Sequence, residues 1–313
     1  MLSARSNTQP EHKTLTKGFA GLCLLLLLSE IAARVFGVLD FPTYHVDEGI
    51  GYIPQPNQHG TFLHRHDWVF NDRSMGTEKP WNPTAQPNIL LIGNSVVMGG
   101  NPYDQNDKLG PLMQGEVGKH YSVWPIAAGG WTNVNETVYL KRNADVARAA
   151  TCFIWEYMSG GLSGLTPWAG EYVWPTSRPV WGSLYAFRRY LLPRILHQNT
   201  GELPRTGDIT PENLASFKDE ISLLSEAASK KGIIFLYPTR AELVMALQGK
   251  EWLPERPELM RIAHDYGLKI VDISLAKEWN ATLYRNDGVH PTVEGNIALA
   301  RILAEAVKER IGR

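Results

Sequence analysis

The stretch Asn88-Ile-Leu-Leu-Ile-Gly-Asn-Ser95 joins a short apolar run to a glycine, an asparagine and a serine. Pro87 and Gly93 bound the apolar run, as is typical of a parallel strand that is buried on both faces. Ser95 would then follow the carboxyl end of this strand, where open α/β sheets bind their ligands. The position suits a nucleophile, although a serine in a strand-to-helix turn also serves as a helix cap. The lipase elbow G-x-S-x-G is excluded, because Val97 occupies the place of its second glycine.

Apolar runs and amphipathic stretches alternate along the rest of the chain. Such alternation favours a parallel sheet that is covered by helices. Thr210 and Pro211 mark the start of one helix as its cap and first residue, and Gly232 is expected to close it. The expected strands are 88–92, 121–127, 152–157, 233–237 and 269–273, and the expected helices are 133–147, 212–231 and 293–311. We therefore expect one α/β domain over residues 88–313.

A second motif, Asn286-Asp-Gly-Val-His-Pro-Thr292, precedes the last predicted helix. Asp287 and His290 are three residues apart in a turn that glycine and proline shape, so both side chains can face one site. An activated serine needs a neighbouring base, and the base needs a group that orients it and stabilises its charged form. The pair supplies both roles. An isolated D-x-x-H spacing is common, however, and it also fits a surface turn with a solvated histidine.

Together the two motifs resemble the SGNH/GDSL hydrolase family, at Gly93-Asn-Ser95 for its first block and Asp287-Gly-Val-His290-Pro for its last. The resemblance runs from about residue 88 to residue 311. It includes the order of the blocks, the strand before the serine and the helix after the histidine. It implies a flavodoxin-like three-layer α/β/α fold with a parallel sheet, and ester hydrolysis or acyl transfer as the activity.

The resemblance also implies a role for each catalytic residue. Ser95 would be the nucleophile, His290 the general base, and Asp287 the group that orients the histidine. Backbone N–H groups of Ser95 and of Gly130, in Ala127-Ala-Gly-Gly-Trp131, would form the oxyanion hole. No cofactor or metal is expected.

Two positions depart from the family pattern. Asn94 stands where an aspartate is usual, which keeps a similar shape but removes a charge. The third block should read G-x-N-D, whereas Glu156-Tyr-Met-Ser-Gly160 places Ser159 at the asparagine position. Loss of one oxyanion donor costs ~10²–10³ in rate. A non-catalytic member of the same fold, which binds or assembles envelope polysaccharide, is therefore the alternative.

The N-terminal region predicts a membrane anchor. Residues 1–17 form a basic tail with Arg5, Lys13 and Lys17, and residues 18–39 contain a leucine run that is long enough to span a membrane if Glu30 and Arg34 pair. We expect an uncleaved signal anchor with the tail in the cytoplasm and the catalytic domain extracytoplasmic. A cleaved signal peptide and a buried helix of a soluble protein are the alternatives.

Two further segments flank the predicted strands. Residues 40–87 are rich in proline, glycine, histidine and asparagine and are expected to form turns and short strands in a juxtamembrane segment. The segment from about residue 160 to residue 208 interrupts the alternation of strands and helices and has few sequence signals for either. Long insertions of this kind commonly serve as lids or binding loops. Trp168, Trp174 and Trp181 in this insertion are candidates to stack on a sugar, with core packing as the alternative.

The composition limits the classes of partner. The 313 residues contain 31 Lys+Arg and 32 Asp+Glu, so the net charge of −1 gives no general attraction to nucleic acid. Cys23 and Cys152 are the two cysteines, too few for a disulfide framework or a cysteine metal site. The sequence thus predicts a membrane-tethered serine esterase that acts on acylated cell-envelope carbohydrate or another ester. An O-acyltransferase or a lipid esterase is the further alternative.

Overall fold

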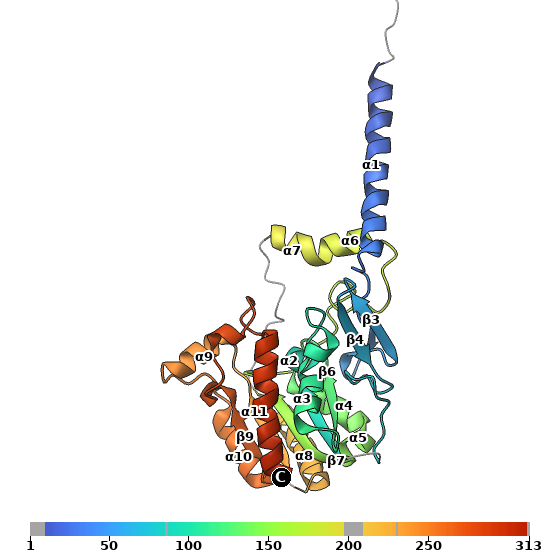
Figure 1. The fold of residues 1–313 in the computed structure, drawn as a ribbon. Coiled ribbons are helices and arrows are strands. Elements are labelled where there is room, and N and C mark those ends of the chain that lie inside the picture. Colours follow the sequence, from blue (N-terminus) through green and yellow to red (C-terminus); the bar gives the residue numbers. More distant parts are fainter. Residues whose placement is uncertain (1–9, 85–86, 197–208, 230, 312–313) are drawn as a thin grey trace, which may run out of the picture.

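A five-stranded parallel sheet forms the centre of the molecule in the computed structural model, which describes residues 10–84, 87–196, 209–229 and 231–311 (Figure 1). The strand order is β6-β5-β7-β8-β9, which is the doubly wound order 2-1-3-4-5 of flavodoxin-like folds. The strands are β5 (Asn88–Gly93), β6 (Ser122–Ala127), β7 (Ala150–Tyr157), β8 (Gly232–Leu236) and β9 (Lys269–Asp272). The predicted α/β fold is confirmed.

Helices cover both faces of this sheet because successive residues of a strand point to opposite sides. In β5, Ile89 and Leu91 pack in the cluster that includes α3 and α11, whereas Leu90 and Ile92 pack in the cluster that includes α4, α8 and α10. All four side chains are fully buried. The helices are α2 (Ser95–Met98), α3 (Leu109–Val117), α4 (Asn133–Arg142), α5 (Ala144–Arg148), α8 (Pro211–Ala227), α9 (Arg240–Leu247), α10 (Arg256–Tyr266) and α11 (Val293–Ile311), with short 3₁₀ turns at η1 (Gln105–Asp107), η3 (Ile273–Leu275) and η4 (Ala281–Leu283).

The segment that precedes the sheet folds into two antiparallel hairpins. They pair β1 (Tyr44–Asp47) with β2 (Gly51–Pro54), and β3 (Gln58–Phe62) with β4 (His66–Phe70). Tyr52 and Met75 are fully buried in the core of the α/β domain. The short strands that we expected in residues 40–87 are therefore present, and they pack against the domain.

Helix α1 (Pro10–Val35) projects from the globular part (Figure 1). Its portion from Lys17 to Val35 is long and apolar enough to cross a membrane, and only a small share of it is buried. The helix ends four residues before the predicted limit at Leu39, because Gly37 adopts the left-handed conformation that terminates helices. Residues 1–9 of the predicted tail lie outside the described part of the chain.

The insertion after β7 contains more helix than the sequence analysis predicted. Three consecutive elements, α6 (Gly182–Ala186), the π-helical η2 (Phe187–Leu191) and α7 (Leu192–Ile195), cross the foot of α1 (Figure 1). The expectation of an irregular stretch is therefore wrong for residues 182–195. Residues 197–208 of the predicted insertion lie outside the described part of the chain.

Candidate active site

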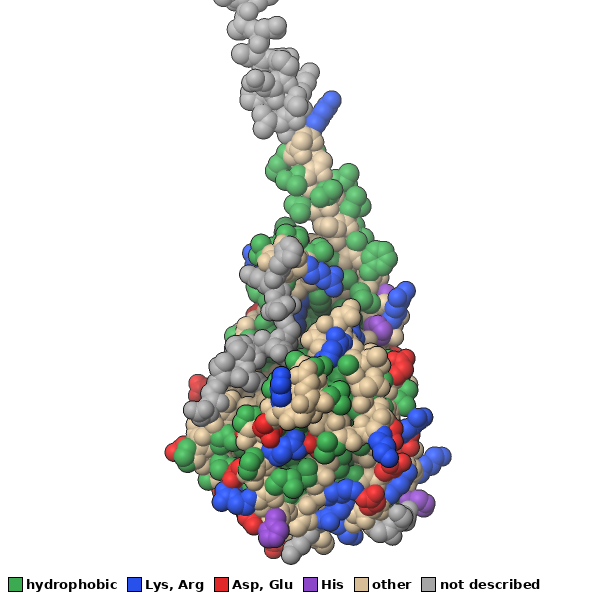
Figure 2. Space-filling model, turned by 90° about the vertical axis from the view of Figure 1, so that its left-hand side faces the viewer, with side chains coloured by type: hydrophobic (Ala, Val, Ile, Leu, Met, Phe, Trp, Pro, Cys, Tyr) green, Lys and Arg blue, Asp and Glu red, His purple; other side chains and the backbone are tan. Residues whose placement is uncertain are grey.

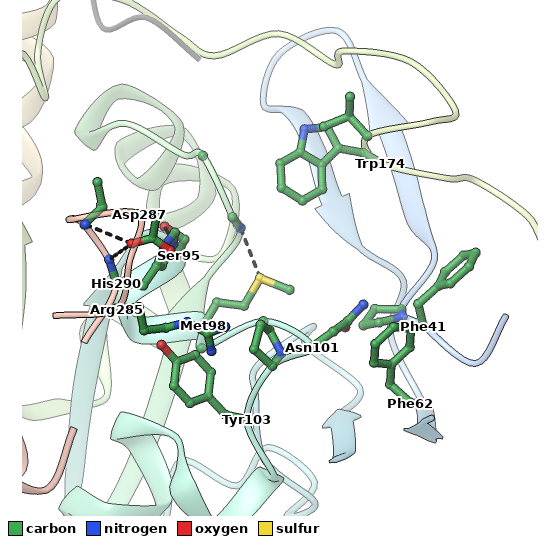
Figure 3. A pocket seen from close by; sticks show the side chains of 18 of the residues that line it. Phe41, Phe62, Ser95, Met98, Asn101, Tyr103, Trp174, Arg285, Asp287 and His290 are labelled. Carbon is green, nitrogen blue, oxygen red and sulfur yellow. Dashed lines mark hydrogen bonds and ion pairs between the residues drawn. The ribbon is translucent and has the colours of Figure 1, made fainter. Parts of the chain in front are cut away.

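The structure brings together the three side chains that the two sequence motifs singled out (Figure 3). Ser95 is the first residue of α2, directly after β5, and its Oγ lies 2.8 Å from Nε2 of His290. On the other side of the imidazole, Nδ1 lies 3.1 Å from Oδ2 of Asp287. A hydroxyl, an imidazole and a carboxylate thus form one continuous hydrogen-bonded chain, the arrangement that activates a serine.

A buried glutamate supports the turn that presents Ser95. The backbone N–H of Asn94 donates to Oε2 of Glu156 over 3.0 Å, and the Asn94 side chain accepts from the N–H of Val96. A Cβ at Gly93 would lie 2.3 Å from the same Glu156 oxygen, so this position requires glycine. Asn94, where the family usually has an aspartate, therefore acts as the N-cap of α2.

The turn that carries Asp287 is organised by the same carboxylate. Its Oδ1 accepts the backbone N–H groups of Val289 and His290, each over 2.9 Å, and Gly288 takes a positive φ between them. Burial raises the pKa of Asp287, but these hydrogen bonds and the one from the His290 ring outweigh it and hold the pKa well below its ordinary value. Asp287 is therefore ionised at neutral pH and can stabilise a protonated His290.

Buried tyrosines hold this turn against the sheet. The hydroxyl of Tyr237 donates to the carbonyl oxygen of Val289 over 2.7 Å, and that of Tyr103 donates to the carbonyl oxygen of Pro291 over 2.5 Å. Burial raises the pKa of Tyr103 to about 12 and that of Tyr237 still further, so both hydroxyls remain donors. Sequence reasoning missed both residues, because their acceptors are main-chain atoms of a distant segment.

Backbone N–H groups are available for an oxyanion beside Ser95. The N–H of a residue in the first turn of a helix has no intrahelical acceptor, and Ser95 begins α2. Gly130 has φ +78°, and both residues line the cavity described below. The preceding residue, Gly129, is fixed by its N–H to Sδ of Met98 (3.0 Å) and by the hydroxyl of Tyr52, which donates to its carbonyl oxygen over 2.6 Å.

The side chain of Ser159, the third predicted oxyanion donor, is directed elsewhere. Its hydroxyl donates to the carbonyl oxygen of Trp252 over 3.2 Å, although the residue lines the same cavity. A side-chain donor at this position would require rotation of the hydroxyl away from that carbonyl. The two backbone donors do not depend on such a rotation.

The three residues line a cavity of about 1030 Å³ (Figure 3). Tyr185 of α6 and Arg194 of α7 line the same cavity. Trp174 lines it, and its ring stacks on Tyr52 with centroids 4.8 Å apart. Trp168 lies behind and donates from Nε1 to the carbonyl oxygen of Trp174 over 2.8 Å. Trp181 is 58% exposed at the start of α6 and does not line the cavity. Of the three tryptophans singled out in the sequence, the structure thus places Trp174 on the wall of the cavity that Ser95 also lines, and the other two do not line it.

Neither a protein-family model nor a curated protein sequence matches the chain. Among solved structures, it is similar to a carbohydrate acetylesterase family member from Sinorhizobium meliloti, at 14% identity and TM-score 0.40, over 73% of this chain and 100% of that one. It is also similar to a catalytic mutant of an acetylxylan esterase from Geobacillus stearothermophilus, at 15% identity and TM-score 0.42, over 71% of this chain and 94% of that one. A psychrotrophic esterase from Pseudoalteromonas is similar at 11% identity and TM-score 0.40, over 73% of this chain and 100% of that one.

Proposed function

We propose that the protein is a membrane-anchored serine esterase that hydrolyses acyl esters of cell-envelope carbohydrate. The observation that carries this proposal is the chain of hydrogen bonds from Asp287 through His290 to Ser95, with lengths of 3.1 and 2.8 Å, at the carboxyl end of a central parallel strand. These groups and their order are those of a nucleophile, a base and an orienting acid.

In the proposed reaction, Oγ of Ser95 attacks the ester carbonyl while its proton passes to Nε2 of His290. Asp287 stabilises the resulting imidazolium, and the backbone N–H groups of Ser95 and Gly130 stabilise the oxyanion. His290 then returns the proton to the departing alcohol, which leaves an acyl group on Ser95. In the second half, a water molecule gives a proton to His290 and attacks the carbonyl carbon of the acyl group. The bond from that carbon to Oγ of Ser95 then breaks, His290 returns its proton to Oγ, and the carboxylic acid is released. A sugar hydroxyl in place of this water would make the reaction an acyl transfer.

The substrate class and the location rest on two features. The cavity beside Ser95 is large enough for a saccharide, and the flat ring of Trp174 lies on its wall. Helix α1 supports an anchor, and the basic residues Arg5, Lys13 and Lys17 at the N-terminal side of its apolar part favour an extracytoplasmic domain. A reporter fused after Arg313 should be active outside the cytoplasm, and an active cytoplasmic reporter would overturn the topology.

A fluorophosphonate probe tests the nucleophile directly, because labelling requires an activated serine. The full-length protein in detergent should be labelled and should turn over 4-nitrophenyl acetate, whereas Ser95→Ala should do neither and should keep its thermal unfolding profile. Labelling that persists in Ser95→Ala would contradict the assignment. Absence of both labelling and turnover in the natural sequence would favour the non-catalytic alternative, for which the engaged hydroxyl of Ser159 is the supporting observation.

A further inference from the structure

Residues 180–195 present an exposed apolar stripe. Val180 lies just before α6, and Leu184, Phe187, Leu191 and Ile195 follow every three or four residues along the consecutive helices α6, η2 and α7, which is the spacing of residues on one helix face. Their exposed fractions range from 42% to 82%. Single exposed apolar side chains are common in proteins, but a continuous stripe of this kind marks a contact surface.

Hydrogen bonds connect the start of the stripe to the end of the candidate membrane span. The carboxylate of Glu30 accepts the backbone N–H groups of Gly182 (3.1 Å) and Ser183 (2.9 Å), which belong to the first turn of α6. Arg34 pairs with Glu30 over 2.7 Å and donates to the carbonyl oxygen of Val180 over 2.8 Å. Glu30 and Arg34, which we expected to pair within the membrane span, therefore also join α1 to α6. Helix α6 lies across the axis of α1 (Figure 1).

The surroundings of the stripe indicate a lipid surface. Hydrophobic side chains gather along α1 and around its foot, whereas most charged side chains lie over the globular part below (Figure 2). Residues 180–196 contain Arg188, Arg189 and Arg194 and no aspartate or glutamate. Interfacial amphipathic helices, which lie in the plane of a bilayer surface, have such an apolar face with arginines beside it. A helix that lies in the bilayer surface must cross the axis of a helix that spans the bilayer, as α6 crosses the axis of α1 (Figure 1).

The side of these helices that faces the domain forms part of the cavity. Tyr185, Arg189, Tyr190 and Arg194 line the same cavity as Ser95. Two arginines of the helices at the foot of α1 therefore line the same cavity as the serine. Planar guanidinium groups bind phosphate through paired hydrogen bonds.

We propose that the apolar stripe lies in the bilayer surface and that the cavity accepts a phosphate-bearing amphiphile from this bilayer. Its phosphate binds Arg189 and Arg194, and its acyl ester reaches Ser95. This inference rests on the proposed esterase function and names the substrate class, an acylated carbohydrate that is carried on an anionic lipid. Because the membrane contact is a separate physical claim, it can be tested without turnover.

Depth-dependent quenching tests the membrane contact. Full-length protein with Cys23→Ser and Leu191→Cys, labelled with bimane and placed in nanodiscs with doxyl-labelled phosphatidylcholine, should be quenched severalfold more than the matched Met260→Cys protein. Met260 is 49% exposed on α10, at the end of the domain remote from α1, and the remaining native cysteine, Cys152, is buried (Figure 1). Equal quenching at the two positions would overturn the membrane contact.

Three probes that share 6-O-acetylglucose and differ only in the group on its anomeric oxygen test the substrate class. This group is methyl in the first probe, octadecyl in the second, and an octadecyl phosphate, joined as a phosphodiester, in the third. In nanodiscs, the phosphodiester should be hydrolysed about tenfold faster than the neutral octadecyl glucoside, and both faster than the free methyl glycoside. Arg189→Gln with Arg194→Gln should abolish the preference for the phosphodiester over the neutral lipid within that variant. Arg188→Gln is the matched control and should keep the preference, because the Arg188 guanidinium lies over the Tyr172 ring, 5.3 Å from its centroid.

The outcomes separate this inference from the proposed function. Equal rates on all three probes would overturn the lipid substrate while leaving the esterase intact. A preference that survives in the double arginine variant would overturn the phosphate site. No turnover of any probe, together with no fluorophosphonate labelling, would overturn the esterase, and the quenching experiment would still decide the membrane contact.

Discussion

The hydroxyl of Tyr52 donates a 2.6 Å hydrogen bond to the carbonyl oxygen of Gly129. This bond connects the hairpin β1-β2 to the loop that carries the candidate oxyanion donor Gly130. Tyr52 is fully buried, and its main-chain carbonyl accepts Nε1 of Trp131 over 2.8 Å. The segment before the α/β domain therefore helps to set the geometry beside Ser95.

Tyr52→Phe should lower kcat severalfold, because Gly130 loses part of its support while the ring still packs against Trp174. Stability should fall by about 1 kcal/mol, the usual net value of one hydrogen bond. The matched control is Tyr139→Phe, which removes an equivalent 2.8 Å bond to the carbonyl oxygen of Arg73 away from the cavity. Equal kcat losses in the two variants, measured with 4-nitrophenyl acetate, would argue against the positioning role.

Ser95→Ala and His290→Ala should each abolish most ester turnover, and the double variant should be hardly slower than either single one. Nucleophile and base act as one unit, so their losses do not add. The measurement is kcat for the three variants against the uncatalysed rate. Losses that multiply in the double variant would show that the two residues act independently.

Asp287→Asn should lower kcat by up to about 10⁴-fold through misorientation of His290. The same variant should also show the linkage of the carboxylate to stability. Because folding holds the pKa of Asp287 below its ordinary 3.8, its stabilisation is complete above that value and is lost as the pH falls below it. The Tm difference from the natural protein should thus be larger at pH 5 than at pH 3.

Trp174→Ala should reduce kcat/KM for a carbohydrate ester more than for a small aryl acetate, because Trp174 lines the cavity. Trp168→Ala, from the same insertion but behind the cavity wall, is the matched control and should not change the ratio of the two substrates. Equal losses on both substrates for Trp174→Ala would indicate that the ring serves only to pack against Tyr52.

Lys108→Met should stabilise the protein at pH 7. Burial lowers the pKa of Lys108 to about 8 even though the charges of Asp104 and Asp67 raise it, so the folded protein binds fewer protons than the unfolded chain between about pH 8 and 10.5. The stability of the natural protein therefore rises with pH over this window. The gain from Lys108→Met should approach ~3 kcal/mol at pH 7 and fade by pH 10.5, as measured by unfolding in urea.

The exposed lysine variant Lys250→Met is the control for the loss of one charge. A stabilisation by Lys108→Met that stays the same at pH 7 and pH 10.5 would show that packing, and not the protonation of the buried amine, is responsible.

Local patterns were sufficient to predict the parts of the fold that depend on local chemistry. The buried run before Ser95 became β5, and the cap at Thr210 with Pro211 starts α8 as expected. Gly232 was wrongly expected to close that helix. It begins β8 instead, where a Cβ would lie 2.2 Å from the Phe153 ring, so glycine is needed there for close packing between strands.

The relationships that sequence reasoning missed are contacts between distant segments. Tyr237 and Tyr103 donate hydrogen bonds to main-chain carbonyls of the turn that carries Asp287 and His290. Every residue has such a carbonyl, so these bonds correspond to no sequence pattern near either partner. Glu30 could be paired with Arg34 by their spacing, but its bonds to the first turn of α6 span more than one hundred and fifty residues. Such contacts depend on the tertiary arrangement and not on a local pattern.

The distance between Ser95 and His290, 195 residues along the chain, has a consequence for the order of synthesis. A ribosome produces the serine and most of the sheet well before it produces the base. Domains form progressively from the N-terminal side during synthesis. Until β9 and the turn before α11 have emerged and docked, the serine has no proton acceptor, so an incomplete chain in transit is chemically inert towards the esters that it passes.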